Sequence, residues 1–343
     1  EPLTNYLSKP PSHFLENRLN EADDAMLITG YYEDILVSNN LNSKISDMKK
    51  RPDNWVQFPQ LAIAKRTFDW RGYEFRTNFE DIHKDVAFNT NSWGFRDKEY
   101  ALPKPPNTFR IGVFGGSFVA GAGTAQEDLF HTIINQTFNT DSISGKRIEM
   151  VNMATPSYHI LHNTYMAEQK GLDKDLDVIA VVSHALDYGR AYKTLQRIVK
   201  QDSVPYPFIR QLVEKYEYVD TGQNWRSDQL KYPGLGRELA EHAYQHLAEV
   251  CEREGIVPMY IYWPRAPEEI YDAEELENTI KYVQELGYLV LDLRNVFDGM
   301  DSKSLYLAPF DRHPNKLAHR LIAEGMVRQL RASKEIADLF NKQ

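Results

Sequence analysis

The chain has 343 residues, of which 42% are hydrophobic, so it can bury the core of one large domain or of two modest ones. Its formal net charge of -9 excludes DNA and RNA as expected partners, because proteins bind nucleic acid by replacing phosphate counterions with Lys and Arg. The one cysteine, Cys251, excludes an internal disulfide, and its place in a stretch of helical spacing indicates a core thiol.

Hydropathy and the start of the chain bear on its location. No run of about 18 apolar residues occurs, so the sequence predicts no membrane span. The chain opens at Glu1 without Met and without a basic-then-apolar stretch, and we expect a preceding segment that served as a signal or an anchor. We expect an extracytoplasmic or periplasmic protein; the cytoplasm stays open, because a lone cysteine does not fix the compartment.

Residues 1–105 show no regular alternation of strands and helices. They carry aromatic and turn-rich stretches such as NWVQFPQ, FDWRGYEF and NTNSWGFRD, and the Pro-rich stretch LPKPPN ends them like a linker. We therefore predict an N-terminal cap or accessory region over residues 1–105 and a second domain over residues 106–343.

From residue 109 onward the sequence alternates between short apolar runs and helical patterns. The predicted strands are FRIGVFGG, RIEMVNM, DVIAVVS, IVPMYIYW and YLVLDL, and an amphipathic helix, NKLAHRLIAEGMVRQLRAS, closes the alternation. Thr124 and Glu127 have capping-box spacing, which predicts the start of the helix after the first strand. Strands separated by helices pair in parallel, so we predict a three-layer α/β sandwich with a five-stranded, flavodoxin-like sheet.

One connection is too long for an ordinary loop. Residues 187–236 form an insertion between the third strand and the next predicted helix. Long insertions in compact domains are often functional, and we predict that this one, together with the residues before the first strand, covers the mouth of a site.

Ligands of open α/β sheets bind at the carboxyl ends of the strands, and the loop after the first strand is GGSFVAGAG. Its glycines allow a sharp turn that presents Ser117 beside a helix N-terminus. A phosphate-binding turn and an ordinary strand-to-helix loop are the competing interpretations. A P-loop requires a lysine, however, and none occurs from Ile111 to Gly145, while a dinucleotide site requires an acid where the second strand ends in Asn152.

A second group of candidate residues lies before the last helix, in LYLAPFDRHPNKLAHRL. A serine nucleophile needs a base, and the base needs a carboxylate that fixes its tautomer. His313 and Asp311 supply these two groups, and the fold would bring them to the same sheet edge as Ser117. The sequence thus predicts a Ser-His-Asp triad.

These two blocks resemble the SGNH (GDSL-like) hydrolase family, over roughly residues 89–331. The Gly-Gly-Ser block at 115–117 is similar to the family's Gly-Asp-Ser block, with Gly116 in place of Asp, and Asp-Arg-His-Pro-Asn at 311–315 is similar to its last block. The lead-in NTNSWGFRDKEYALPKPPNTFRI looks like that of bacterial cell-envelope members. The resemblance implies nucleophilic catalysis by Ser117, with His313 as base and Asp311 as its partner.

The resemblance also implies an oxyanion hole, whose parts depart from the family pattern. The Ser117 amide is retained, and Ser157 takes the place of a glycine whose amide is the second donor. Leu186 and Asp187 align with an Asn-Asp pair, so the Asn donor is replaced, and one lost donor can cost about 10² to 10³ in rate.

Two other polar residues near strand ends are candidates for the missing oxyanion donor. They are Asn152 and His184, and capping of a turn is the plainer interpretation for each. We predict a substrate-binding set at these strand ends that consists of Gly116, Asn152, His184, Leu186 and Asp187.

Several other residues have both a functional and a structural interpretation. A metal cluster at His159, His162 and His184 is conceivable, but no carboxylate or cysteine recurs at ligand spacing, and we expect no metal and no cofactor. Trp93 and the aromatic residues around Tyr206 and Trp225 would stack on a sugar, line an acyl pocket, or serve packing alone.

The family resemblance implies an esterase or O-acyl hydrolase that acts on an acylated carbohydrate, with a lipid or small ester second. A carbohydrate O-acyltransferase would use the same triad, with a sugar hydroxyl in place of water. The replaced oxyanion donor leaves a third interpretation open, a catalytically weak or inactive binding protein.

Overall fold

The computed structural model describes residues 52–140, 146–184, 187–220, 222, 225–265 and 273–342. Its centre is a five-stranded sheet in the order β6-β5-β7-β8-β9, and every neighbouring pair is parallel. The strands are β5 (Thr108–Phe114), β6 (Arg147–Asn152), β7 (Val178–Ser183), β8 (Val257–Tyr262) and β9 (Leu289–Asp292). This is the flavodoxin-like order, and all five strands fall on the apolar runs that predicted them.

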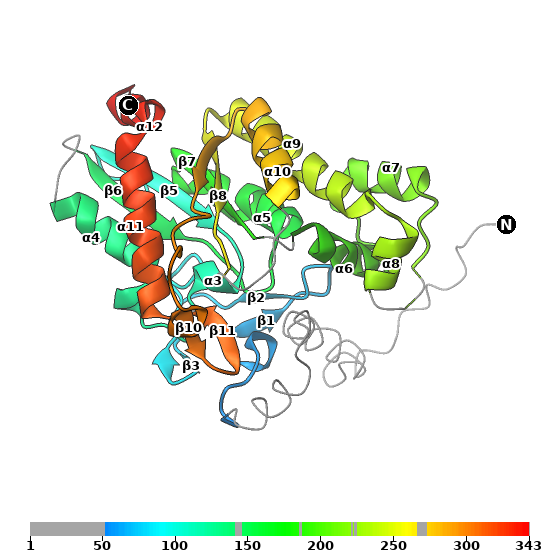
Figure 1. Ribbon diagram of the computed structural model, residues 1–343, viewed down its shortest axis with the longest axis horizontal. Helices are drawn as coiled ribbons and strands as arrows, with labels where there is room; N and C mark the ends of the chain where they lie inside the picture. Colours follow the sequence, from blue (N-terminus) through cyan, green and yellow to red (C-terminus); the bar gives the residue numbers. More distant parts are fainter. Residues whose placement is uncertain are drawn as a thin grey trace. The chain divides into compact units, whose positions relative to one another are not determined.

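Helices cover both faces of the sheet (Figure 1). One face packs against α4 (Phe130–Thr140) and α11 (Lys316–Ala332). The other packs against α5 (Ile160–Met166), α9 (Leu235–Glu254) and α10 (Ala273–Glu285). Alternate residues of β7 enter different clusters: Val182 joins the first and Val181 the second, as the two-residue period of a strand requires. The predicted three-layer sandwich is confirmed.

The segment after β5 differs from the prediction. A single helical turn, α3 (Ser117–Ala120), follows the strand directly, a 3-10 turn, η3 (Gln126–Asp128), comes next, and α4 begins only at Phe130. The predicted capping box at Thr124 is wrong: the Thr124 hydroxyl donates to the carbonyl of Pro314 at 3.0 Å, far along the chain. A tertiary hydrogen bond has replaced the local one.

Residues 52–105 form short antiparallel pairs. Strands β1 (Ala64–Arg66) and β2 (Tyr73–Phe75) pair with each other, as do β3 (Ile82–His83) and β4 (Val86–Ala87). Side chains from this region, such as Phe75 and Phe88, share a hydrophobic cluster with β5 and α4. The predicted boundary near residue 105 stays a prediction, but the two sides of it are packed together in one cluster.

The insertion after β7 is helical where it is described. It contains α6 (Asp187–Lys200), α7 (Pro207–Lys215) and α8 (Trp225–Lys231). Helices α6 and α7 pack beside α9, and α8 packs beside α6. Helix α12 (Lys334–Lys342) ends the described chain, after α11. Among the described helices, none combines the length and the apolar character that crossing a bilayer demands.

Candidate active site

Ser117 lies at the carboxyl end of β5, where it begins the single turn α3. The turn is tight, since a Cβ added at Gly115 would come within 2.5 Å of the Val119 side chain, and Gly121 ends it with a φ of +74°. Glycine accommodates the close approach at position 115 and the left-handed backbone at position 121 without a steric penalty from a side chain. The order β6-β5-β7 reverses the winding at β5, so the serine sits at the sheet's topological switch point.

A hairpin before α11 carries the other two predicted residues. Strand β10 (Tyr306–Ala308) pairs with β11 (Asp311–Pro314), which places Asp311 and His313 on one short strand. Asn315 then caps α11, because its side chain accepts hydrogen bonds from the amides of Leu317 and Ala318. The block Asp-Arg-His-Pro-Asn thus orients the strand and starts the helix behind it.

The three side chains meet in one hydrogen-bonded chain. The Nε2 atom of His313 lies 2.9 Å from Ser117 Oγ, and its Nδ1 atom lies 2.5 Å from Asp311 Oδ1. Asp311 also accepts the His313 backbone amide at 3.1 Å. Because the short contact to a carboxylate requires a proton on Nδ1, Nε2 is left as the acceptor for the serine hydroxyl. This is the tautomer that a general base needs.

A lysine from the turn between β3 and β4 completes this chain. Lys84 Nζ lies 2.5 Å from the second carboxylate oxygen of Asp311, and both side chains are only 2% exposed. The ammonium also lies 3.3 Å from His313 Nδ1. Asp311 is therefore held at both oxygens, on one side by the imidazole and on the other by a buried cation.

Burial and charge set the protonation states. Burial would raise the pKa of Asp311, but the charges and hydrogen bonds of His313 and Lys84 hold that pKa well below its usual range. Burial lowers the pKa of His313 and Lys84 lowers it further, while Asp311 opposes both effects. The carboxylate is thus ionised and the imidazole neutral at neutral pH, which are the states required for proton abstraction from a serine.

The loop after β6 approaches the serine from the other side. The amide of Thr155 donates to the carbonyl of Gly115 at 3.1 Å, and Tyr158 N–H donates to the Thr155 carbonyl at 3.1 Å. Pro156 and Ser157, the latter with a φ of +69°, occupy the centre of this turn, as in a type II turn, where glycine is usual. Among the described residues, the Ser157 amide has no hydrogen-bond acceptor.

Residues 52–105 also fix this turn and the nucleophile loop. The Tyr73 hydroxyl donates to the Pro156 carbonyl at 2.8 Å, and the Tyr158 hydroxyl donates to the Tyr73 carbonyl at 2.6 Å. The buried Arg96 donates to the carbonyls of Gly121 and Thr124, the latter at 2.7 Å. Both halves of the candidate site are therefore anchored from this region.

No sequence signal pointed to these anchoring residues. Tyr73, Lys84 and Arg96 act on partners far along the chain, which hydropathy periods and local motifs do not reveal.

Two of the predicted substrate-binding residues have structural contacts. Asn152 is buried, donates to the Val119 carbonyl at 3.0 Å and accepts from the Ala154 amide at 3.1 Å, so its side chain stabilises the loops after β5 and β6. At Gly116, a Cβ would lie 3.1 Å from the Tyr158 carbonyl oxygen. A side chain at position 116 would therefore be tightly packed, and the Tyr158 carbonyl would have to move by a few tenths of an ångström to admit it.

The loop after β7 is only partly described. His184 is buried, and its Nδ1 lies 3.0 Å from the Trp263 carbonyl, which makes Nδ1 the protonated nitrogen. The ring of Phe118 contacts the rings of both His184 and His313, with centroids 4.8 and 5.7 Å away, so His184 borders the candidate site. Leu186 lies outside the described residues, as does the side chain of Asp187.

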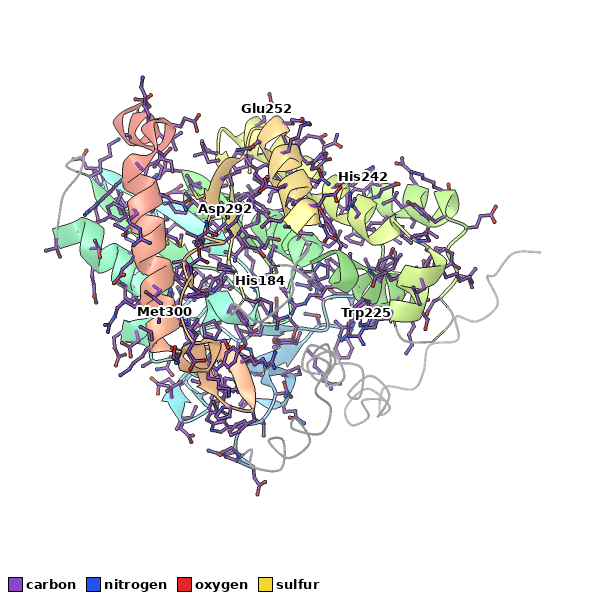
Figure 2. The ribbon with its side chains drawn as sticks, viewed as in Figure 1. His184, Trp225, His242, Glu252, Asp292 and Met300 are labelled. Carbon is purple, nitrogen blue, oxygen red and sulfur yellow. The ribbon has the colours of Figure 1, made fainter. Side chains whose placement is uncertain are left out.

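The remaining candidates lie in packed surroundings. His159 Nε2 lies 2.5 Å from Thr194 Oγ1, and His162 stacks on Tyr158. Figure 2 shows Trp225 apart from His184, on α8, where it packs against Gly189 of α6. No group of three or more metal-ligating side chains gathers anywhere in the described ranges.

The other aromatic candidates also have intramolecular contacts. Trp93 stacks on Tyr100, and the buried Tyr206 donates its hydroxyl to Glu168 at 2.7 Å. Packing accounts for both side chains.

Comparison with known proteins gives structural likeness at low identity. No family model matches the chain, and no curated protein matches it. A lipolytic protein of the G-D-S-L family from Desulfitobacterium hafniense is 18% identical, with a TM-score of 0.40 over 64% of this chain and 98% of that one. A variant of an acetylxylan esterase from Geobacillus stearothermophilus is 14% identical, with a TM-score of 0.42 over 65% and 94%.

A third similar structure is an alpha/beta hydrolase from the metagenome of Lake Arreo, Spain. It is 13% identical, with a TM-score of 0.42 over 64% of this chain and 94% of that one. At such identities and TM-scores, the chemistry of the site has to come from this chain's own residues.

Proposed function

We propose that the chain is a serine esterase, an O-acyl hydrolase that uses Ser117, His313 and Asp311. The observation that carries the proposal is the continuous hydrogen-bonded chain from Ser117 Oγ through His313 to Asp311, 2.9 and 2.5 Å long at its two links. Nucleophile, base and orienting carboxylate are in reach of one another at the sheet edge where α/β enzymes bind substrates.

The chemistry follows from this geometry. Ser117 Oγ attacks the ester carbonyl while its proton passes to His313 Nε2. The amides of Ser117 and Ser157 donate to the oxyanion. The bond from the acyl carbon to the alcohol oxygen then breaks, and His313 returns the proton to that oxygen. Water, deprotonated by the same imidazole, attacks the acyl-enzyme, releases the carboxylic acid and restores Ser117.

The substrate class belongs to the proposal as well. The resemblance to envelope members favours an acetylated carbohydrate, and an extracytoplasmic location would fit that substrate. If a sugar hydroxyl reached the acyl-enzyme before water, the same residues would transfer the acyl group instead.

A fluorophosphonate probe and a chromogenic acetate ester test the proposal together. We expect labelling and hydrolysis in the unaltered chain and neither in Ser117→Ala. The matched control is Ser92→Ala, which removes an exposed hydroxyl bound to Glu99 at 2.7 Å and should change nothing. A folded protein that neither reacts with the probe nor cleaves the ester overturns the proposal and favours a binding protein.

Acetylated xylooligosaccharides then separate the substrate classes. Release of free acetate identifies a hydrolase, while acetyl groups on an added unacetylated oligosaccharide identify a transferase. Turnover of small esters alone, with no action on either carbohydrate, would contradict the carbohydrate part of the proposal.

A further inference from the structure

The turn between β3 and β4 has an unusual composition. Lys84 and Asp85 form its two-residue loop, and both have positive φ angles, 53° and 67°. Such hairpin turns normally contain Asn-Gly or another glycine pair, because side chains disfavour this backbone. Strained backbone of this kind persists where the surrounding structure holds it, often at functional sites.

The surroundings hold both residues of this turn. The carboxylate of Asp85 accepts hydrogen bonds from Asn54 Nδ2 and from Trp55 Nε1, each at 2.7 Å. The Trp55 ring lies 5.9 Å from Lys84 Nζ, and it packs edge-on against Phe310 at the tip of the β10–β11 hairpin, 5.3 Å away. The lysine is thereby fixed relative to the strand that carries Asp311.

Lys84 contacts the oxygen of the Asp311 carboxylate that does not face His313. Its Nζ lies 2.5 Å from Asp311 Oδ2, while the other oxygen, Oδ1, faces His313 Nδ1. With one oxygen bound by the ammonium, the carboxylate cannot rotate without breaking a buried ion pair. Uncompensated buried charges are strongly disfavoured, so this orientation is fixed.

We propose that Lys84 is a positioning residue of the catalytic group: it locks the Asp311 carboxylate toward His313 and, as a buried cation, weakens the stabilisation of the imidazolium. This inference rests on the proposed esterase function and extends it from three residues to four. Its consequence is a base that stays neutral, and hence active, at lower pH than a triad without the lysine.

Several charged or titratable groups face His313, and their balance decides the direction of this effect. They come from β11, the β3–β4 hairpin, the segment after β8 and α11: Asp311, Lys84, His83, Arg265 and His319. His83 and His319 have pKa values lowered to about 2 and about 3, so they are uncharged in the working range. The two cations, Lys84 and Arg265, disfavour the imidazolium, and the carboxylate favours it.

The pH profile of kcat/KM in Lys84→Met and Lys84→Arg tests the inference. Loss of the cation should move the acid limb of Lys84→Met to higher pH by about one unit, the lower end of what a nearby charge produces. We expect kcat to fall roughly tenfold, since the carboxylate loses its fixed orientation, with little change in KM. Lys84→Arg keeps the charge, so its acid limb should lie at the same pH as that of the unaltered chain.

A matched control separates this role from simple anchoring. Lys104 Nζ also lies 2.5 Å from a carboxylate oxygen, that of Asp177, but at the amino end of the sheet, away from the site. Lys104→Met should lose stability and leave the pH profile unmoved. If Lys84→Met behaves in the same way, the lysine only ties the hairpin to the sheet domain and the inference is wrong.

Titration of the His313 imidazole by NMR keeps the inference separate from the esterase proposal. The pKa of His313 should rise by about one unit in Lys84→Met whether or not the chain cleaves esters. An inactive protein with this shift would contradict the esterase but support the coupling. An active protein in which Lys84→Met leaves the His313 pKa unchanged would contradict the inference alone.

Discussion

The loops at the carboxyl edge of the sheet and the region over residues 52–105 contribute to the candidate site in different ways. The segments after β5 and β6 and the β10–β11 hairpin supply every group with a proposed role in proton transfer or oxyanion binding, including Ser117 and His313. The N-terminal region supplies the groups that hold those loops: Lys84 on Asp311, and Arg96 on the backbone after α3. The reacting groups and the residues that position them therefore come from separate parts of the chain.

The largest expected effect follows from substituting one of the candidate catalytic residues. Asp311→Asn should lower kcat by on the order of 10⁴, because an amide beside Nδ1 favours the wrong imidazole tautomer. The measurement is turnover of a chromogenic acetate ester at saturating substrate. Asp177→Asn is the control, since that carboxylate pairs with Lys104 at the opposite edge. Equal losses in both variants would mean that Asp311 contributes only to folding.

The next largest effect concerns a residue that anchors the site, and it is measured as a change in the free energy of unfolding. Arg96 is buried and donates to backbone carbonyls at and after the end of α3. Arg96→Met removes this donor from the carbonyls of Ala120 and Thr124, while the Gly121 carbonyl keeps the hydrogen bond from the Thr124 amide. We expect the free energy of unfolding in urea to fall by about 3 kcal/mol. Arg76 donates to the exposed carbonyl of Ala62 at 3.0 Å, and Arg76→Met should cost less than about 1 kcal/mol. A similarly small loss of unfolding free energy in Arg96→Met would show that the loop after β5 keeps its conformation without the Arg96 side chain.

The two regions also differ in how far their sequences predict them. The five strands are apolar runs buried on both sides, and such runs are recognisable without any tertiary information. Asp311 and His313 were predictable because they lie two positions apart, with one residue between them, and a helix follows. The sandwich and the three candidate catalytic residues therefore came from sequence alone.

The N-terminal region lacks such signals. Strands β3 and β4 have two residues each, and Lys84-Asp85 replaces the Asn-Gly that would identify the hairpin. Thr124 illustrates the same limit inside the sheet domain. Its spacing to Glu127 predicted a helix cap, but its hydroxyl donates a hydrogen bond to the Pro314 carbonyl. Contacts between distant residues decide these positions, and no local pattern encodes them.

Stability against pH tests whether the two regions unfold together. His83 in the N-terminal region and His319 in α11 have folded pKa values lowered to about 2 and about 3, against 6.5 in the unfolded chain. The unfolded chain therefore binds more protons below pH 6.5. Each histidine should remove about 1.4 kcal/mol of stability per pH unit as the pH falls from 6.5 toward the folded value, with the full stability present above 6.5.

Single replacements by phenylalanine locate this loss. His83→Phe and His319→Phe remove the titrating group within aromatic surroundings, and each should flatten the decline of unfolding free energy between pH 6.5 and about 4. If unfolding is a single transition and both variants reduce its dependence on pH, the two regions unfold as a unit. If His83→Phe affects only an earlier, separate transition, the N-terminal region unfolds on its own. A wild-type stability that is level over this range would contradict the assignment of neutral buried histidines.

The smallest expected effect concerns the oxyanion side, where the loop after β6 meets its anchor Tyr73. Ser157 has a φ of +69°, which disfavours a side chain by about 1 kcal/mol, so Ser157→Gly should raise the free energy of unfolding by up to that amount. Because the variant keeps the backbone amide, kcat/KM should stay within about twofold if Ser157 contributes its amide, and not its hydroxyl, to oxyanion binding. Ser157→Ala keeps the strain and should change neither quantity. A tenfold fall in kcat/KM for both variants would assign the role to the serine hydroxyl, and the loop would then belong to the reacting groups through its side chain.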